Sequence, residues 1–186
     1  MALDDDCLML RIQQHDQNAF SHLVDRHLIA LHGFAQRMLG NPMDAEDIIQ
    51  ETFIRVWQKA NLWQPKSAKV TTWLHQIVYH LCIDHQRRQK NTLVDITTVE
   101  LIAPQQPSTD CQQSKVVIQV KAALQKLPDN QRSALILSHY QEMPYQQVAA
   151  VLGISLAAVE SLITRARRNL RKSLQSQLEH LLGEVE

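Results

Sequence analysis

Residues 145–164, YQQVAAVLGISLAAVESLIT, have the spacing of two short helices joined by a tight turn. Gly153 can adopt the positive φ that such a turn requires, and Ser155 is placed to cap the second helix. Ala149 is small where the two helices approach each other. This pattern predicts a helix-turn-helix and favours a DNA-binding unit over a plain helical hairpin. Five apolar side chains are expected to fill the angle between the helices: Val148, Leu152, Ile154, Val159 and Leu162.

The second helix of the motif continues as SLAAVESLITRARRNLRK over residues 155–172. Leu156, Val159, Ile163, Ala166 and Leu170 have the 3-4-3-4 spacing of a buried seam. The outward side chains are small first and basic later, which suits a helix whose start enters the major groove and whose arginines contact phosphates. These outward residues are Ala157, Ala158, Ser161, Thr164, Arg165, Arg168 and Lys172.

Glu160 is an acidic residue in this otherwise basic helix. It lies at the flank of the outward face, about 80° from the centre of the seam. A carboxylate near the base-reading end of a helix can accept a hydrogen bond from a cytosine amino group. Glu160 is therefore a candidate selectivity residue, and the alternative is a flank residue that pairs with a neighbouring basic side chain.

The composition favours helices throughout the chain. Only four of the 186 residues are glycine, and a hydrophobic content of 45% is enough for a packed core. The net charge of zero hides an asymmetry, because residues 61–90 carry five basic and one acidic group while residues 1–60 carry five and nine. Residues 115–186 are again basic, with nine basic and six acidic groups.

Residues 91–114, NTLVDITTVELIAPQQPSTDCQQS, interrupt the helical periodicity and hold two prolines without a basic residue. This composition predicts a flexible linker. The expected fold is all-α, with two small helical domains at 1–90 and 115–186, the second a four-helix domain that contains the helix-turn-helix. The expected helices are about 5–16, 19–39, 42–60, 70–90, 115–126, 129–141, 144–152 and 155–180.

The predicted helix at 42–60 has a strong start signal and two distinct faces. Asn41 can cap it, and Pro42 suits the first helical position. One face is apolar, at Ala45, Ile48, Ile49, Thr52, Phe53, Val56 and Ala60. The opposite face carries Asp47, Gln50, Glu51, Ile54 and Gln58. A solvated acidic face is one interpretation, and the exposed Ile54 favours a surface for a protein partner.

The predicted helix at 70–90 ends in Arg87, Arg88 and Lys90. Basic residues at a helix C-terminus also stabilise the helix dipole, so these charges alone do not establish a binding role. Lys66 and Lys69 lie in the preceding loop between Trp63 and Trp73. Lysines that alternate with exposed aromatic rings are typical of surfaces on which unpaired bases stack.

Other function classes have little support. Three scattered cysteines, without a CxxC pair, indicate neither a disulfide framework nor a zinc site, and the histidines at five-residue spacing rotate around their helices. We find no nucleophile elbow, phosphate loop or catalytic carboxylate pair, so no enzymatic role, metal or cofactor is expected. The N-terminus is acidic and no apolar run approaches the length of a membrane span, which favours a cytoplasmic protein.

Taken in order, these motifs resemble the extracytoplasmic-function (ECF) sigma factors, the two-domain promoter-recognition subunits of bacterial RNA polymerase. DAEDIIQETFIRVWQ (44–58) resembles the helix that docks on the polymerase β′ clamp helices. VTTWLHQIVYHLCIDHQRR (70–88) is similar to the segment that melts and reads the minus-ten element. LPDNQRSALILSHYQEMPYQQVAAVLGIS (127–155) and VESLITRARRNL (159–170) resemble the domain that reads the minus-thirty-five element. The resemblance covers about residues 8–175.

The resemblance implies three sets of contact residues. Those for core polymerase are Asp44, Asp47, Gln50, Glu51 and Ile54. Those for the minus-ten element are Lys66, Ser67, Lys69, Trp73, His80, Asp84, Arg87 and Arg88. Those for the minus-thirty-five element are Ala157, Glu160, Ser161, Thr164, Arg165 and Arg168. The sequence departs from the family at His80, where many relatives have Asn, and at Glu160 and Leu162, where many have Lys or Arg.

The partners that the resemblance implies are core RNA polymerase, contacted at the β′ clamp helices and the β flap, promoter DNA and a cognate anti-sigma factor. Two other interpretations stay open. A stand-alone helix-turn-helix regulator would be a homodimer that binds duplex DNA without polymerase. A helical regulator that binds only proteins would leave the arginines of residues 165–172 solvated, and the 115–186 fragment would show no salt-sensitive DNA binding.

Overall fold

The structure, a computed structural model, describes residues 3–65, 68–95 and 113–183. The described part is helical, as the sequence predicted. The first half contains α1 (Asp5–Ile12), α2 (Gln17–Leu39), α3 (Pro42–Lys59), a short 3-10 turn η1 (Ala60–Leu62) and α4 (Val70–Asp95). The second half contains α5 (Gln113–Gln125), α6 (Asp129–Leu135), a π-helical turn η2 (Ile136–Tyr140), α7 (Tyr145–Leu152) and α8 (Leu156–Gly183).

The predicted start and stop signals act where the sequence placed them. The Asn41 side chain accepts a hydrogen bond from the Met43 backbone N–H at the start of α3. Gly40 and Gly153 both have positive φ, at 78° and 66°, at the ends of α2 and α7. The Ser155 hydroxyl accepts from the backbone N–H of Ala158 and caps α8. The boundaries of the helix-turn-helix are therefore confirmed.

Three predicted helix boundaries differ from the structure. Helix α4 runs five residues beyond its predicted end at residue 90, so its last turn takes up the start of the predicted linker. Residues 96–112, which hold the rest of that linker, lie outside the described part. The helix expected over 129–141 changes at Ile136 into the π-helical turn η2. The helix expected over 5–16 ends at Ile12, because His15 adopts a positive φ of 62°.

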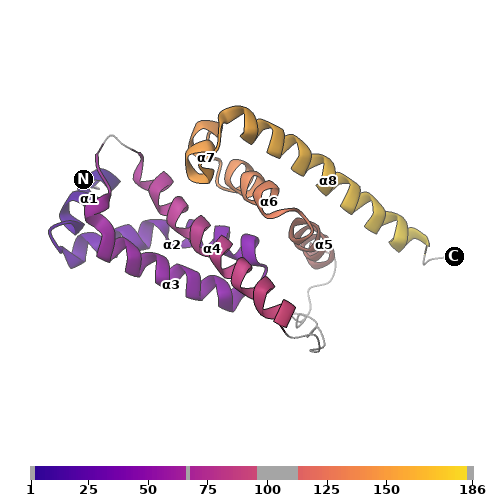
Figure 1. The fold of residues 1–186 in the computed structure, drawn as a ribbon, viewed down its shortest axis with the longest axis horizontal. Helices are drawn as coiled ribbons and strands as arrows, with labels where there is room; N and C mark the ends of the chain where they lie inside the picture. Colours follow the sequence, from indigo (N-terminus) through magenta and orange to yellow (C-terminus); the bar gives the residue numbers. More distant parts are fainter. Residues whose placement is uncertain (1–2, 66–67, 96–112, 184–186) are drawn as a thin grey trace.

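The first half is a bundle in which α2, α3 and α4 pack on one another and α1 covers one end (Figure 1). All seven residues of the predicted apolar face of α3 are buried. The largest fully buried side chain is Trp63, which the sequence analysis had placed on the surface. That expectation is wrong, because the Trp63 ring closes the core below the loop and its indole N–H donates to the Ala68 carbonyl at 3.1 Å.

The second half is built around the helix-turn-helix. Val148, Val159 and Ile163 are buried between α7 and α8, and Ala166 continues the seam toward α6. Leu156, predicted as the first seam residue, is instead 41% exposed. It is the first residue of α8 and lies where the turn leads the chain away from α7, so nothing covers it on that side.

The two halves pack against each other in this structure. Helix α7 lies on α4, while α5, α6 and η2 lie against α2 (Figure 1). One cluster of buried apolar side chains runs through both halves, from Phe34 and Val78 on one side to Ile136 and Val148 on the other. Of the described helices, none alone is long and apolar enough to cross a membrane, and only α7 with α8, bent by 98°, reaches that hydropathy as a pair.

His75 is buried in α4, beside Phe34 of α2, and predicts a pH-dependent stability. Its Nδ1 lies 2.8 Å from the Thr71 carbonyl, Nε2 has no hydrogen-bond partner, and burial lowers the pKa of the imidazole below its ordinary value of 6.5. The unfolded chain therefore binds a proton that the folded chain does not. We expect the free energy of unfolding to fall by up to about 1.4 kcal/mol per pH unit below pH 6.5.

The measurement is urea unfolding at pH 7.5 and pH 5.5, on the wild type and on His75→Gln. The variant removes the titrating group, so its stability should change less between the two pH values. His22→Gln, at an exposed histidine, is the matched control and should keep the wild-type difference. Equal stability of the wild type at the two pH values would contradict the assignment.

Candidate nucleic-acid and protein interfaces

Helix α4 presents a continuous stripe of polar and aromatic side chains away from the core. Trp73, His80, Asp84 and Arg87 follow each other at spacings of seven, four and three residues, which places them on one face. Trp73 is half-buried and the other three are exposed. Arg88 is exposed on the neighbouring face. Five of the eight residues predicted to contact the minus-ten element are thus brought together along about four turns of one helix.

The loop before α4 is held from below by the first helix. The Gln13 side chain donates to the carbonyls of Ala60 and Trp63, at 3.1 and 2.9 Å. Together with the Trp63 indole bond to Ala68, these contacts fix both ends of the loop. Lys69 is exposed directly before α4, while Lys66 and Ser67 lie outside the described residues. Gln13 is a supporting residue that the sequence analysis missed, since its partners are backbone carbonyls about fifty positions away.

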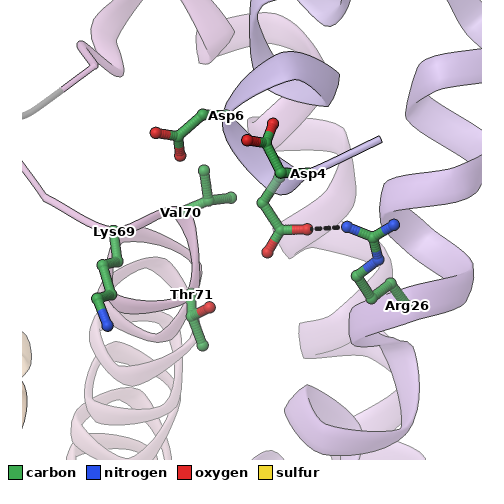
Figure 2. Close-up of a pocket in the computed structure, with 7 residues that line it drawn as sticks. Asp4, Asp6, Arg26, Lys69, Val70 and Thr71 are labelled. Carbon is green, nitrogen blue, oxygen red and sulfur yellow. Dashed lines mark hydrogen bonds and ion pairs between the residues drawn. The ribbon is translucent and has the colours of Figure 1, made fainter. Parts of the chain in front are cut away.

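An open pocket of about 490 Å³ lies beside this loop. Lys69, Val70 and Thr71 at the start of α4 form one side, and Asp4, Asp6 and Arg26 lie opposite (Figure 2). Figure 2 also shows the ion pair that ties the N-terminal segment to α2, in which Arg26 binds an Asp5 oxygen.

Asp5 anchors that N-terminal segment. Its other carboxylate oxygen lies 2.8 Å from His27 Nε2. The hydrogen bond with His27 lowers the pKa of Asp5 most, desolvation opposes it, and Arg26 lowers the pKa further. The carboxylate is therefore held in its charged form, and the N-terminal acidic residues are fixed next to the start of α4.

Helix α3 exposes a second stripe on the opposite side from its apolar face. Asp47, Gln50 and Ile54 are exposed at three- and four-residue spacing, and Ile54 is 49% exposed despite its apolar side chain. Glu51 lies beside them and pairs with Arg55 at 2.7 Å. Asp44, predicted as part of this set, is turned toward α4, where its carboxylate lies 3.4 Å from His85 Nε2. Four of the five predicted residues therefore share one accessible surface.

Helix α8 carries the third stripe. Ala157, Glu160, Thr164, Arg165 and Arg168 are exposed, and Ser161 is half-buried between them. The Arg165 guanidinium donates to the Ser161 hydroxyl at 2.7 Å, which fixes the arginine along the helix. All six residues predicted for the minus-thirty-five element therefore lie on one face of α8, with the small residues at its start.

Within the described part of the chain, Glu160 has no ion-pair partner. The structure therefore gives no support to the alternative in which Glu160 is neutralised by a neighbouring basic side chain. Its backbone carbonyl accepts from the Thr164 hydroxyl at 2.9 Å, a contact that leaves the carboxylate free to face a ligand. No group of three or more His, Cys, Asp or Glu side chains suited to a metal ion occurs among the described residues.

Comparison with known protein families matches both halves. Residues 23–92 match sigma-70 region 2, and residues 118–170 match sigma-70 region 4. The first matched segment contains the α3 and α4 stripes, and the second contains the helix-turn-helix and the α8 stripe. The two regions occur in the order that the sequence analysis predicted.

Two curated relatives illustrate the similarity. The ECF RNA polymerase sigma factor SigE of Mycolicibacterium smegmatis is 32% identical over 84% of this chain, which spans 62% of that relative's length. The ECF RNA polymerase sigma factor SigW of Bacillus subtilis is 28% identical over 89% of this chain and 94% of its own length. The similarity to SigW covers nearly the whole of both proteins.

Solved structures agree with the sequence relatives. CnrH, in complex with the cytosolic domain of CnrY, has a TM-score of 0.71 at 27% identity and covers 93% of this chain and 99% of its own. The sigma factor RpoE of Bartonella quintana, in complex with the anti-sigma factor NepR, has a TM-score of 0.67 at 27% identity, over 84% of this chain and 96% of its own. Together with the two matched regions, these likenesses show that the chain belongs to the ECF sigma factors.

Proposed function

We propose that the chain binds core RNA polymerase and directs promoter-specific initiation of transcription. The observation that carries this proposal is the presence of three separate exposed stripes, on α3, α4 and α8, in a chain that matches sigma regions 2 and 4 in order. One stripe is acidic with an exposed apolar residue, and the other two combine basic side chains with aromatic or small ones. This division suits one protein partner and two DNA segments.

The α3 stripe is the proposed docking surface for core polymerase at the β′ clamp helices. Ile54 offers apolar area at its centre, and Asp47 and Gln50 offer hydrogen-bond acceptors and charge around it. This arrangement of a small apolar centre within a polar rim is typical of protein interfaces. The β flap of the polymerase is the proposed partner of the second half.

The α4 stripe is the proposed minus-ten reader. Its arginines lie toward the C-terminal end of α4 and suit phosphates, whereas Trp73 and Lys69 lie near the loop and suit an unstacked base. The pocket beside Lys69 is the proposed place for that base. A base flipped out of the stack costs a few kcal/mol, which stacking and polar contacts offset.

The α8 stripe is the proposed minus-thirty-five reader. The small residues Ala157 and Ser161 allow the start of the helix to approach base edges, and Arg165 and Arg168 lie farther along to contact phosphates. The chain acts in the cytoplasm, where core polymerase and promoters are found, and needs no catalytic group of its own. A cognate anti-sigma factor holds it inactive, in line with the complex of the similar RpoE with NepR.

The docking surface is tested by the double variant Asp47→Ala with Gln50→Ala. Both side chains are exposed and have no role in the core, so the variant should fold. Truncation of two interface residues at about 1–2 kcal/mol each predicts at least a tenfold loss of affinity for core polymerase. The measurement is binding to purified core, with circular dichroism as the folding check.

Asp25→Ala with Gln14→Ala is the matched control, because these residues are an exposed acid and an exposed amide on other segments. It should bind core with wild-type affinity. An unfolded Asp47/Gln50 variant would instead give these residues structural roles. The proposed function itself fails if the wild type neither binds core nor yields a promoter-specific transcript from a promoter library.

The role of Glu160 is tested by promoter selection with Glu160→Ala. If the carboxylate accepts from a cytosine amino group, its loss should relax the preference at one position of the minus-thirty-five element by about 1–3 kcal/mol. Overall affinity should change less than the preference. Arg168→Ala is the comparison, because loss of a phosphate contact should weaken all sequences about equally and reduce the salt dependence. An unchanged preference would make Glu160 a flank residue without a reading role.

A further inference from the structure

The end of α2 is capped by side chains from the other half of the chain. A helix leaves its last carbonyls without partners inside the helix. Here the Gln125 side chain donates to the Arg37 carbonyl at 2.8 Å, and the Arg132 guanidinium donates to the Met38 carbonyl. Gly40 helps, because a side chain at that position would meet Gln125 at about 3.0 Å. Region 4 therefore completes a helix of region 2.

Arg132 is the centre of this contact and is only 5% exposed. Besides Met38, its guanidinium donates to the Gln125 side chain at 2.9 Å and to the Leu127 carbonyl at 3.0 Å. Burial lowers the pKa of Arg132, and the nearby Asp129 opposes this. The positive charge lies at the negative end of the α2 dipole, which is the favourable position.

Further polar contacts extend the interface on both sides of Arg132. Gln141 of the loop after η2 donates to the Ala30 carbonyl at 3.0 Å, and Gln76 of α4 donates to the Ala150 carbonyl of α7 at 2.8 Å. Lys90 pairs with Asp129 at 3.0 Å near the end of α4. The halves are thus joined by specific hydrogen bonds as well as by the shared apolar cluster.

This packing sets how far apart the two DNA-reading helices lie. Helix α7 touches α4, and α8 touches α7, so the start of α8 lies within about 20 Å of α4 at the usual spacing of packed helices. The minus-ten and minus-thirty-five elements are about 25 base pairs apart, or about 85 Å along B-DNA. A chain closed in this way reaches one element at a time.

We propose that the contact of Gln125, Arg132 and Gln141 with the end of α2, together with Gln76 on α7, is an autoinhibitory latch that must open before the chain reads a whole promoter. This inference rests on the proposed function, because it requires two promoter elements. The α4 and α8 stripes stay exposed in the closed state, so the latch restrains their separation and does not cover them.

The latch is suited to opening. Arg132 keeps its bonds to Leu127 and Gln125 within its own half, and the Met38 carbonyl keeps a second donor in Gln86, at 3.0 Å. Opening therefore leaves few buried polar groups without partners. Interfaces between domains of one chain commonly behave in this way, and a partner that prefers the open state shifts the equilibrium toward it.

The test is the double variant Gln76→Glu with Gln141→Glu. Each change replaces an amide donor by an isosteric carboxylate that faces a carbonyl oxygen, so it removes the bond and adds repulsion. With about fivefold per lost bond, the open fraction should rise at least about 25-fold. Gln14→Glu with Gln17→Glu adds the same charge at exposed sites and is the control.

Small-angle X-ray scattering and core-dependent transcription are measured on the full chain. The wild type and the control should have a radius of gyration near 16 Å, the value for a compact chain of about this length, and the variant should be several ångströms larger. The variant should also form initiation complexes faster with core polymerase, because more of it is already open.

The outcomes separate this inference from the proposed function. An extended wild type, or a variant that opens without faster initiation, would overturn the latch while leaving promoter-specific transcription intact. A wild type that is compact but yields no promoter-specific transcript would overturn the proposed function. A variant that loses helical content is replaced by Lys90→Glu, which places two carboxylates together at Asp129 and makes the same prediction.

Discussion

Helix α4 has to satisfy three neighbours at once, and the rest of the structure depends on how its surface is divided. One side packs on α2 and α3, and a second side lies against α7 through Gln76. The third side carries Trp73, His80 and Arg87 and is left without cover. Any residue moved from one side to another would cost core packing or a DNA contact. The division explains why a helix rich in apolar residues can also be a reading surface.

The sequence predicted the features that depend on neighbouring residues. Gly153 and Asn41 act through φ and a local hydrogen bond, and the apolar face of α3 follows from helical spacing, so each was found before the structure. Trp63 was misplaced because its burial depends on α1, which reaches the loop from about fifty positions away. Leu156 was misplaced because spacing alone does not show where a turn removes the facing helix.

The contact between the halves had no signal in the sequence. Gln76, Gln125 and Gln141 are ordinary surface residues by composition, and each donates to a backbone carbonyl more than seventy positions away. A carbonyl has the same chemistry at every residue, so a single sequence cannot show which one is the partner. The three binding stripes were predictable, whereas the distance at which the chain holds two of them was not.

The central claim is that two DNA-reading helices are held together in the free chain and part on a promoter. The direct measurement is single-molecule energy transfer between dyes at Ile29→Cys and Arg167→Cys, both exposed, with Cys7 and Cys111 replaced by serine. We predict one compact distance in the free chain and a separation greater by roughly 50 Å or more with core polymerase and promoter DNA. The same distance in both states would contradict the account.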